Sequence, residues 1–259
     1  MGTPEKAARR IFGERSVFYA GSAVHKDPEV LKRVVELARP REDSLVLDVA
    51  TGSGHTAAAL APHVEGVVCI DITPQMIAEA EKLTLELGLD DVCFCLADAH
   101  ALPFQDGAFD IVTCRRAAHH FSVVAQALLE MRRVLRPDGR FVLDDRSVPE
   151  DDFVDSCMNE LDRLHDESHV REYRPSQWRS LLEASGFTVD EVEPYSKNLP
   201  LTSLTTNVPR KNAERIRAIV KGLSDEQRKA MNVVEKAGEL YLNHWYVMLS
   251  VHLGWSTAA

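Results

Sequence analysis

Short apolar runs alternate with segments of helical periodicity through the middle of the chain. The runs are apolar at nearly every position, as strands buried on both faces are; they cover Leu45–Val49, Val67–Ile70, Val92–Leu96, Phe109–Cys114 and Gly139–Leu143. The segments between them have the apolar period of helices; they cover His55–Ala61, Pro74–Leu87 and Val123–Leu135. This alternation predicts an α/β fold, with a parallel sheet that carries helices on both faces.

Beyond these elements, a helix over Ser176–Ser185 is predicted to end at Gly186 and to lead into a sixth strand, Phe187–Val192. A last apolar run covers Trp245–Leu253. We therefore expect one domain over residues 1–259; its parts are an N-terminal helical segment (1–40), a core (41–145), a lid-like segment (146–175) and C-terminal strands (176–259) with a helical insertion (196–240). The insertion is predicted to hold helices over Pro209–Leu223 and Ser224–Leu240. The three extra segments either pack as a cap or enclose a substrate.

Composition excludes several classes of partner. The chain has 30 basic and 40 acidic residues, a net charge of −10, which argues against non-specific binding to nucleic acid or to anionic membranes. No run approaches the roughly 18 apolar residues that cross a bilayer, and the first residues lack an apolar signal core. We therefore expect a cytoplasmic protein without stable membrane insertion. None of the five cysteines forms a C-x-x-C pair, so no metal site is predicted.

A glycine-rich loop follows the first predicted strand, in the stretch VLDVATGSGHTA. Gly52, Gly54 and Ala57 match the pattern G-x-G-x-x-A, in which a tight turn lets the backbone approach a nucleotide-like ligand. Asp71 ends the second strand, 17 residues after Gly54. A carboxylate there can accept hydrogen bonds from both ribose hydroxyls, which NAD and S-adenosylmethionine each require.

Two further carboxylates separate these ligands. Asp48 lies inside the first strand, where it would repel a pyrophosphate but would suit the ammonium group of a methionine moiety. Asp98 and Ala99 end the third strand, where Asp98 can accept from an adenine amino group. Both observations favour S-adenosylmethionine, and an NAD-dependent oxidoreductase is the first alternative.

Four stretches in order resemble the successive motifs of class I S-adenosylmethionine-dependent methyltransferases; they are VLDVATGSG, CIDITPQMI, LADAHALPFQDGAFDIVTC and EMRRVLRPDGRFVL. The similarity is strongest to the branch that includes the ubiquinone/menaquinone-biosynthesis C-methyltransferases, and it spans residues 40–145. It implies a Rossmann-like three-layer sandwich with a mostly parallel seven-stranded sheet and helical cap insertions, and makes residues 41–145 a cofactor-binding core.

The same resemblance implies how S-adenosylmethionine is held as the cofactor. Gly52 and Gly54 would approach the methionine part, Asp71 the ribose, and Ile72 and Met76 the adenine. The full set of expected cofactor-binding residues is Asp48, Ala50, Gly52, Gly54, Asp71, Ile72, Met76, Asp98, Ala99 and Arg115. Ala50 stands where the family has its first loop glycine, and a modest backbone angle would accommodate it. Replacing Asp71 by alanine is expected to weaken cofactor binding and to leave the apo protein's melting temperature almost unchanged.

The acceptor site is expected at the carboxyl ends of strands four and five, because ligands of such sheets bind there. His119 and His120 follow the fourth strand and are the candidate catalytic residues, with a purely structural role as the alternative. Tyr19, His25 and His169 are predicted to line the acceptor pocket. His165 and His169 are four residues apart and would share a helix face, for which a solvated lid surface is expected rather than a metal site.

These inferences predict an S-adenosylmethionine-dependent methyltransferase that acts on a small molecule. The reacting atom, carbon, oxygen or nitrogen, stays open, as does the choice between monomer and homodimer. Two further functions fit the same residues: a non-catalytic cofactor-binding protein of the same fold, and a protein that uses the bound cofactor as a cation to promote another reaction. No nucleic-acid partner is expected.

Overall fold

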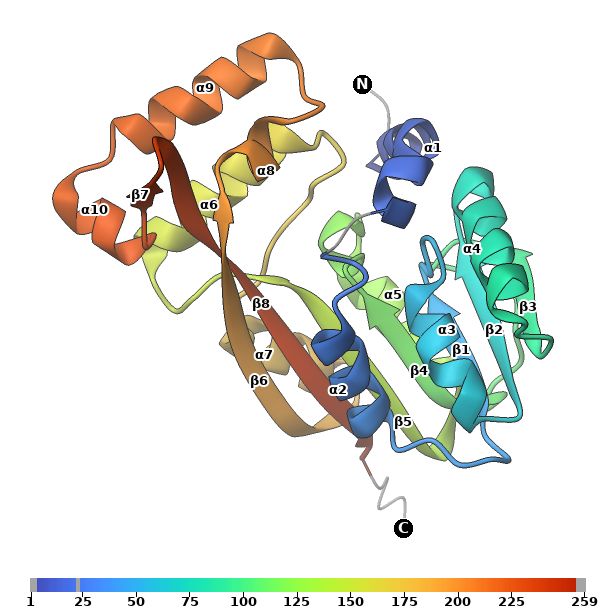
Figure 1. The fold of residues 1–259 in the computed structure, drawn as a ribbon. Helices are drawn as coiled ribbons and strands as arrows, with labels where there is room; N and C mark the ends of the chain where they lie inside the picture. Colours follow the sequence, from blue (N-terminus) through green and yellow to red (C-terminus); the bar gives the residue numbers. More distant parts are fainter. Residues whose placement is uncertain (1–3, 22–23, 255–259) are drawn as a thin grey trace.

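The computed structural model describes residues 4–21 and 24–254. Seven strands form one sheet in the order β3-β2-β1-β4-β5-β8-β6, and a short strand, β7, pairs with β8 (Figure 1). Their bounds are Leu45–Val49 (β1), Gly66–Asp71 (β2), Val92–Leu96 (β3), Phe109–Arg115 (β4), Leu135–Ser147 (β5), Phe187–Pro200 (β6), Val234–Lys236 (β7) and Glu239–Leu253 (β8). Strands β1 to β5 pair in parallel, and β8 runs antiparallel to β5 and β6. The mostly parallel seven-stranded sheet is confirmed, with β7 as an addition.

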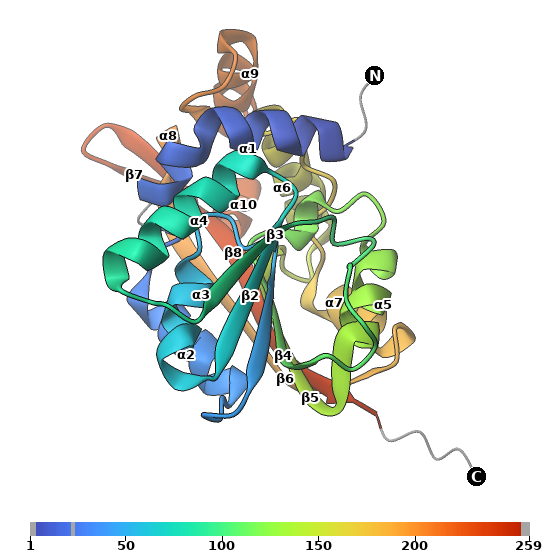
Figure 2. The same ribbon diagram turned by 90° about the vertical axis from the view of Figure 1, so that its right-hand side faces the viewer.

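Helices cover both faces of the sheet (Figure 2). One face carries α2 (Pro28–Ala38), α3 (His55–Leu60) and α4 (Pro74–Leu87), and the other carries α5 (Val124–Val134) and α7 (Pro175–Ala184). Apolar side chains fill both interfaces: Leu37 and Leu60 pack with Val46 on the first face, and Leu128 and Trp178 pack with Val112 on the second. Burial of these side chains stabilises the predicted three-layer sandwich.

A helical cap lies beyond the carboxyl end of the sheet (Figure 1). It contains α6 (Asp152–His165), α8 (Thr202–Thr205), α9 (Arg210–Lys221), α10 (Asp225–Ala230) and β7. Met158, Leu161, Ile216, Val220 and Leu242 form an apolar cluster of its own. Strands β6 and β8 run out of the sheet as a two-stranded ribbon and connect it to the cap.

Two predictions for this region are wrong. Strand β6 continues to Pro200 and β8 already begins at Glu239, so both ends of the expected helical insertion 196–240 are strand. The helix expected over Ser224–Leu240 stops at Ala230. The ribbon projects from the sheet and carries polar residues such as Glu193 and Lys197, so it lacks the continuous apolar run of a strand that is buried on both faces.

Helix α1 (Pro4–Gly21) lies across the carboxyl end of the sheet and contacts both the core and the cap side (Figure 2). On the core side, Gly13 packs against the Gln75 side chain of α4. On the cap side, Arg10 forms an ion pair with Glu167, and Arg15 donates to the carbonyl oxygen of Asn207. Across the two described ranges, no helix is long and apolar enough to cross a membrane.

The glycine loop between β1 and α3 needs left-handed backbone angles at three positions. Gly52 and Gly54 have φ angles of 55° and 81°, and Ala50 has a φ of 54°. Ala50 is thus in the left-handed region, contrary to the modest angle expected, at a cost of about 1–2 kcal/mol. At Gly54, a Cβ atom would lie 2.9 Å from the Cβ of Ala80. This glycine therefore lets α3 and α4 pack closely.

The variant Gly54→Ala is expected to lose about 2–4 kcal/mol of unfolding free energy, because a left-handed alanine is strained and its methyl group would overlap α4. Urea unfolding of the apo protein would measure this loss. Gly88→Ala is the matched control, since Gly88 has a φ of 66° and open space where its Cβ would be. It should lose only the strain, about 1–2 kcal/mol. Equal losses in the two variants would contradict the packing role of Gly54.

Candidate functional site

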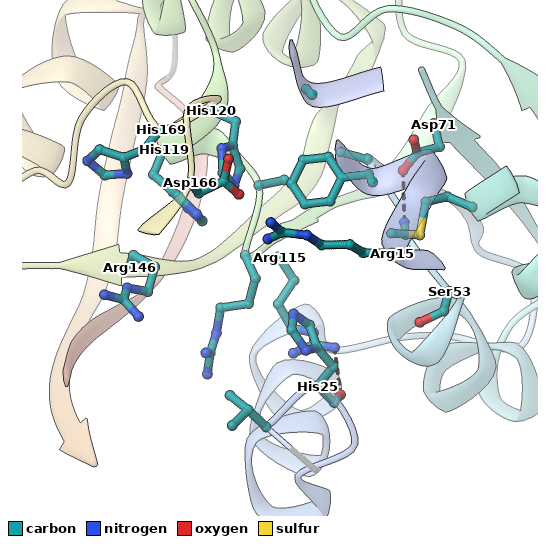
Figure 3. Close-up of a pocket in the computed structure, with 18 of the residues that line it drawn as sticks. Arg15, His25, Ser53, Asp71, Arg115, His119, His120, Arg146, Asp166 and His169 are labelled. Atoms are coloured by element: carbon teal, nitrogen blue, oxygen red, sulfur yellow. Dashed lines mark hydrogen bonds between the residues drawn. The ribbon is translucent and has the colours of Figure 1, made fainter. Parts of the chain in front are cut away.

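A cavity of about 520 Å³ lies at the carboxyl ends of the parallel strands, within the range of small-molecule sites. Its walls come from the glycine loop, α1, the turn after β4 and the cap. Figure 3 shows His119, His120 and His169 grouped on one side, with Asp71 and Ser53 on the other and Arg15 between them. The cavity therefore has a glycine-loop end and a histidine end.

Asp48 is a buried carboxylate at the glycine-loop end. Its two oxygens each accept a hydrogen bond at 2.6 Å, one from the Thr51 hydroxyl and one from the Thr113 hydroxyl. Burial raises the pKa of Asp48, although both hydroxyls favour the charged form. A nearby cation would relieve this cost of burial.

Asp71, at the end of β2, fixes the shape of the loop. Its carboxylate accepts from the backbone N–H of Gly52 at 3.0 Å and from that of Thr73 at 2.8 Å. Burial raises the pKa of Asp71, and these two backbone bonds oppose the rise. These bonds argue against the expectation that an alanine here would leave the apo protein's stability unchanged, because both N–H groups would lose their acceptor.

Most of the other predicted cofactor-binding residues line the same cavity; these are Ala50, Gly52, Ile72, Met76, Asp98 and Ala99. Gly54 is not among the lining residues, in keeping with its packing against α4. Sequence reasoning missed His100, whose backbone N–H and ring both bond the Asp98 carboxylate. The signal in the sequence was the position of His100 two residues after Asp98, at the end of a predicted strand.

Arg115 ends β4 beside the glycine loop and lines the cavity. Its Nε donates to the Thr56 hydroxyl at 2.8 Å, and one Nη donates to the His25 carbonyl oxygen at 2.9 Å. The other Nη is buried and has no hydrogen-bond partner within residues 4–21 and 24–254. Burial lowers the pKa of this guanidinium, and the carboxylates of Asp144 and Asp48 oppose the fall.

His119 is held by a buried carboxylate at the histidine end. Asp145, near the end of β5, accepts from the His119 ring Nδ1 at 2.5 Å and from its backbone N–H at 2.8 Å. Burial opposes ionisation, but the His119 ring keeps the pKa of Asp145 below its usual value. The carboxylate holds a proton on Nδ1, so in the neutral imidazole Nε2 carries the lone pair.

His120 and His169 also line this end of the cavity. The His120 ring lies against Phe12 of α1, with ring centroids 5.0 Å apart. His169 is a buried residue, 7% exposed, so the expectation of a solvated lid surface is wrong. His165 ends α6 and His169 lies beyond it, so the two share no helix face. Within the ranges that the structure describes, no cluster of three or more His, Cys, Asp or Glu could hold a metal ion.

All three extra segments contribute to the walls of the cavity. His25 lines it beside Arg115, and burial together with the neighbouring Arg115 and Arg116 lowers its pKa well below the usual value. Tyr19 lies in α1, but its side chain is outside the part of the chain that the structure describes. Phe12 and Leu204 add apolar wall that sequence reasoning did not single out.

Comparison with known proteins places this geometry among methyltransferases. A family model described as "Methyltransferase domain" matches residues 47–143. The chain is 40% identical over 190 residues to the uncharacterized methyltransferase YcgJ of Bacillus subtilis, covering 73% of this chain and 74% of that protein. The crystal structure of YcgJ superposes with a TM-score of 0.82 at 33% identity, covering 87% of this chain and 99% of that one.

A second similar protein is a demethylmenaquinone methyltransferase of Thermus thermophilus. It is 43% identical over 114 residues, which are 43% of this chain and 51% of that protein. This similarity thus covers less than half of the chain, whereas the similarity to YcgJ covers nearly three quarters.

Proposed function

We propose that this chain, which belongs to the methyltransferase family, transfers a methyl group from S-adenosylmethionine to a small-molecule acceptor. We also propose that it does so in the cytoplasm. The observation that carries the proposal is the presence, in one cavity, of a glycine loop with two strand-end carboxylates and of a histidine backed by a buried carboxylate.

The residues at the glycine-loop end fit S-adenosylmethionine. Within the described ranges, one buried Nη of Arg115 has no hydrogen-bond partner, and the cofactor's α-carboxylate would supply a charged acceptor for it. Asp48 would stabilise the ammonium group, and Asp71 would accept from the ribose hydroxyls. Ile72, Met76 and Ala99 would contact the adenine, and Asp98 would accept from its amino group. When bound, S-adenosylmethionine supplies an electrophilic methyl group on a sulfonium whose leaving thioether is neutral.

His119 is placed to act on the acceptor. Its Nε2 lone pair would accept a proton from the attacking group, and Asp145 would stabilise the imidazolium that forms. Helix α1 and the cap would exclude water and orient the acceptor for in-line attack. The histidine end would therefore provide both alignment and proton removal.

The proposal is tested first by ligand-induced stabilisation. S-adenosylmethionine or S-adenosylhomocysteine at about a hundred times its dissociation constant should add about 2.7 kcal/mol of stability, seen as a higher melting temperature, whereas NAD should add none. Turnover is then sought by mass spectrometry, as products one methylene heavier, over phenols, quinols, amines and thiols. Stabilisation by NAD alone would favour an oxidoreductase. Cofactor binding without any methylated product would favour a non-catalytic protein.

The variant Asp71→Ala is expected to show two effects. Affinity for S-adenosylhomocysteine should fall by about 10- to 100-fold, because the ribose loses a charged acceptor. The apo protein should also lose about 1–3 kcal/mol of stability, because two backbone N–H groups lose their partner. Calorimetric titration and urea unfolding measure the two effects separately. Asp90→Ala, at an exposed position, is the control. Unchanged affinity would place the ribose elsewhere.

A further inference from the structure

The three histidines at the histidine end lie close enough to contact one small molecule. The ring centroids of His119 and His120 are 4.0 Å apart, and those of His119 and His169 are 6.0 Å apart. Each ring uses one nitrogen to bond a group in the cavity wall behind it. The wall group decides which nitrogen carries the proton.

For His120, the proton lies on Nδ1. This nitrogen is 3.0 Å from the Ser168 hydroxyl, which donates its own proton to Asp166 at 2.7 Å. Burial opposes ionisation of Asp166, but the hydrogen bonds from the Ser168 hydroxyl and backbone N–H favour the charged form, so Asp166 accepts. The serine oxygen can then only accept from Nδ1, and His120 Nε2 carries a lone pair. Burial and the neighbouring His119 lower the pKa of His120 to about 3, so the ring is neutral.

For His169, the proton lies on Nε2. This nitrogen is 3.0 Å from the Asn159 carbonyl oxygen, which also accepts from the Glu172 backbone N–H at 2.8 Å. The Asn159 amide nitrogen in turn donates to two oxygens of Asp155, which fixes the orientation of the amide group. His169 Nδ1 therefore carries a lone pair. Burial lowers the pKa of His169 to about 4, so this ring is neutral as well.

Three lone pairs thus belong to the rings that line this end: Nε2 of His119, Nε2 of His120 and Nδ1 of His169. No group within the described ranges donates to any of them. The nearby cation Arg146 uses three of its five N–H groups on Glu172, Asp162 and His244, and it bonds none of these three ring nitrogens. A bound molecule that displaced water from these nitrogens without donating a hydrogen bond to them would bind more weakly than one that donates.

We propose that the methyl acceptor presents at least two hydrogen-bond donors, O–H or N–H, to these rings: one on the reacting atom, bonded to His119, and one more, bonded to His120 or His169. This inference rests on the proposed methyltransferase function and narrows its substrate class. Molecules with a single donor, or with ether oxygens in place of hydroxyls, would leave lone pairs unpaired.

Binding of three matched probes to the protein saturated with S-adenosylhomocysteine tests this inference. Catechol, 2-methoxyphenol and 1,2-dimethoxybenzene carry two, one and no donors on the same ring, and ligand-observed NMR titration to about 10 mM covers the affinity range of such fragments. We expect each lost donor to weaken binding by at least about fivefold. Equal affinities of the three probes, or no binding of catechol, would overturn the inference. The inference would also be overturned if the preference for catechol over its methyl ethers disappeared in excess EDTA, because a bound metal ion would then be responsible for it.

Variants show whether the imidazoles are responsible. Either His120→Leu or His169→Leu should reduce the preference for catechol over 2-methoxyphenol by about fivefold or more, whereas His63→Leu, at an exposed position outside the cavity, should not. An unchanged preference in both cavity variants would overturn the inference. Retained S-adenosylhomocysteine affinity shows that each variant is folded. Failure of the wild-type protein to bind S-adenosylhomocysteine would instead refute the proposed function, so the two failures are distinguishable.

Discussion

Replacing His119 by glutamine is expected to lower kcat by about 10²- to 10⁴-fold, the usual contribution of a positioned general base. The reason is the pair formed with Asp145, which fixes the proton on Nδ1, leaves Nε2 free to accept, and stabilises the charged ring. Glutamine keeps a polar group in the same place but cannot take up a proton. The measurement is turnover of an acceptor found by the mass-spectrometric screen, with S-adenosylhomocysteine affinity measured in parallel.

The chain offers a matched control for this variant. His252 also bonds a carboxylate, with its Nδ1 2.9 Å from Asp190, but it lies outside the cavity. His252→Gln should therefore keep the wild-type kcat. If His119→Gln retains turnover within tenfold, or if cofactor affinity falls together with kcat, His119 is a structural residue and the proposed role is wrong.

The second large effect is expected for Arg115→Met. Among the described residues, this buried guanidinium donates to two neutral acceptors, Thr56 and His25, so a bound carboxylate would add a charge-assisted, poorly solvated hydrogen bond. Its loss should weaken binding of S-adenosylhomocysteine by about 30- to 1000-fold. Methionine at this position keeps much of the apolar stem and removes the charge.

A fragment of the cofactor isolates this contribution. Methylthioadenosine has the adenosine and sulfur but lacks the amino-acid part, so its affinity should be the same in the wild-type protein and in Arg115→Met. Equal losses for both ligands in a calorimetric titration would mean that Arg115 supports the loop near His25 and does not bind the carboxylate. An unchanged affinity for both would place the carboxylate elsewhere in the cavity.

The core of the fold could be predicted because strands β1, β2, β4 and β5 are largely buried and read as apolar runs, and the edge strand β3 is apolar as well. Asp71 and Arg115 stand out because each follows an apolar run and so marks the end of a strand. The ends of parallel strands meet at one edge of the sheet, which brings the two residues to the same edge. The ribbon of β6 and β8 could not be predicted, because away from the sheet it has no such apolar run, and Pro194 is tolerated in β6 because this strand lies at an edge.

The histidine end of the cavity was only partly predictable. His119 and Asp145 are 26 residues apart, and they meet because β4 and β5 are adjacent and parallel. The segment that holds Asn159 and Glu172 contains many charged residues and so suggested a solvated surface. In the structure both residues are buried: Arg146 forms ion pairs with Asp162 and Glu172, and Asn159 bonds His169 and the Glu172 backbone N–H. Mutual neutralisation between distant residues leaves no periodic pattern in a sequence.

The ribbon also has a consequence for how such enzymes diversify. The segment between Pro200 and Glu239 is connected to the core through the paired strands β6 and β8. Asp48, Asp71 and Arg115 belong to other strands, β1, β2 and β4. Insertions, deletions or replacements in this stretch would change one wall of the cavity and leave the spacing of those strand ends unchanged. After gene duplication, changes confined to this segment could therefore alter which molecules fit the cavity while the glycine loop and the ends of β1, β2 and β4 stay the same.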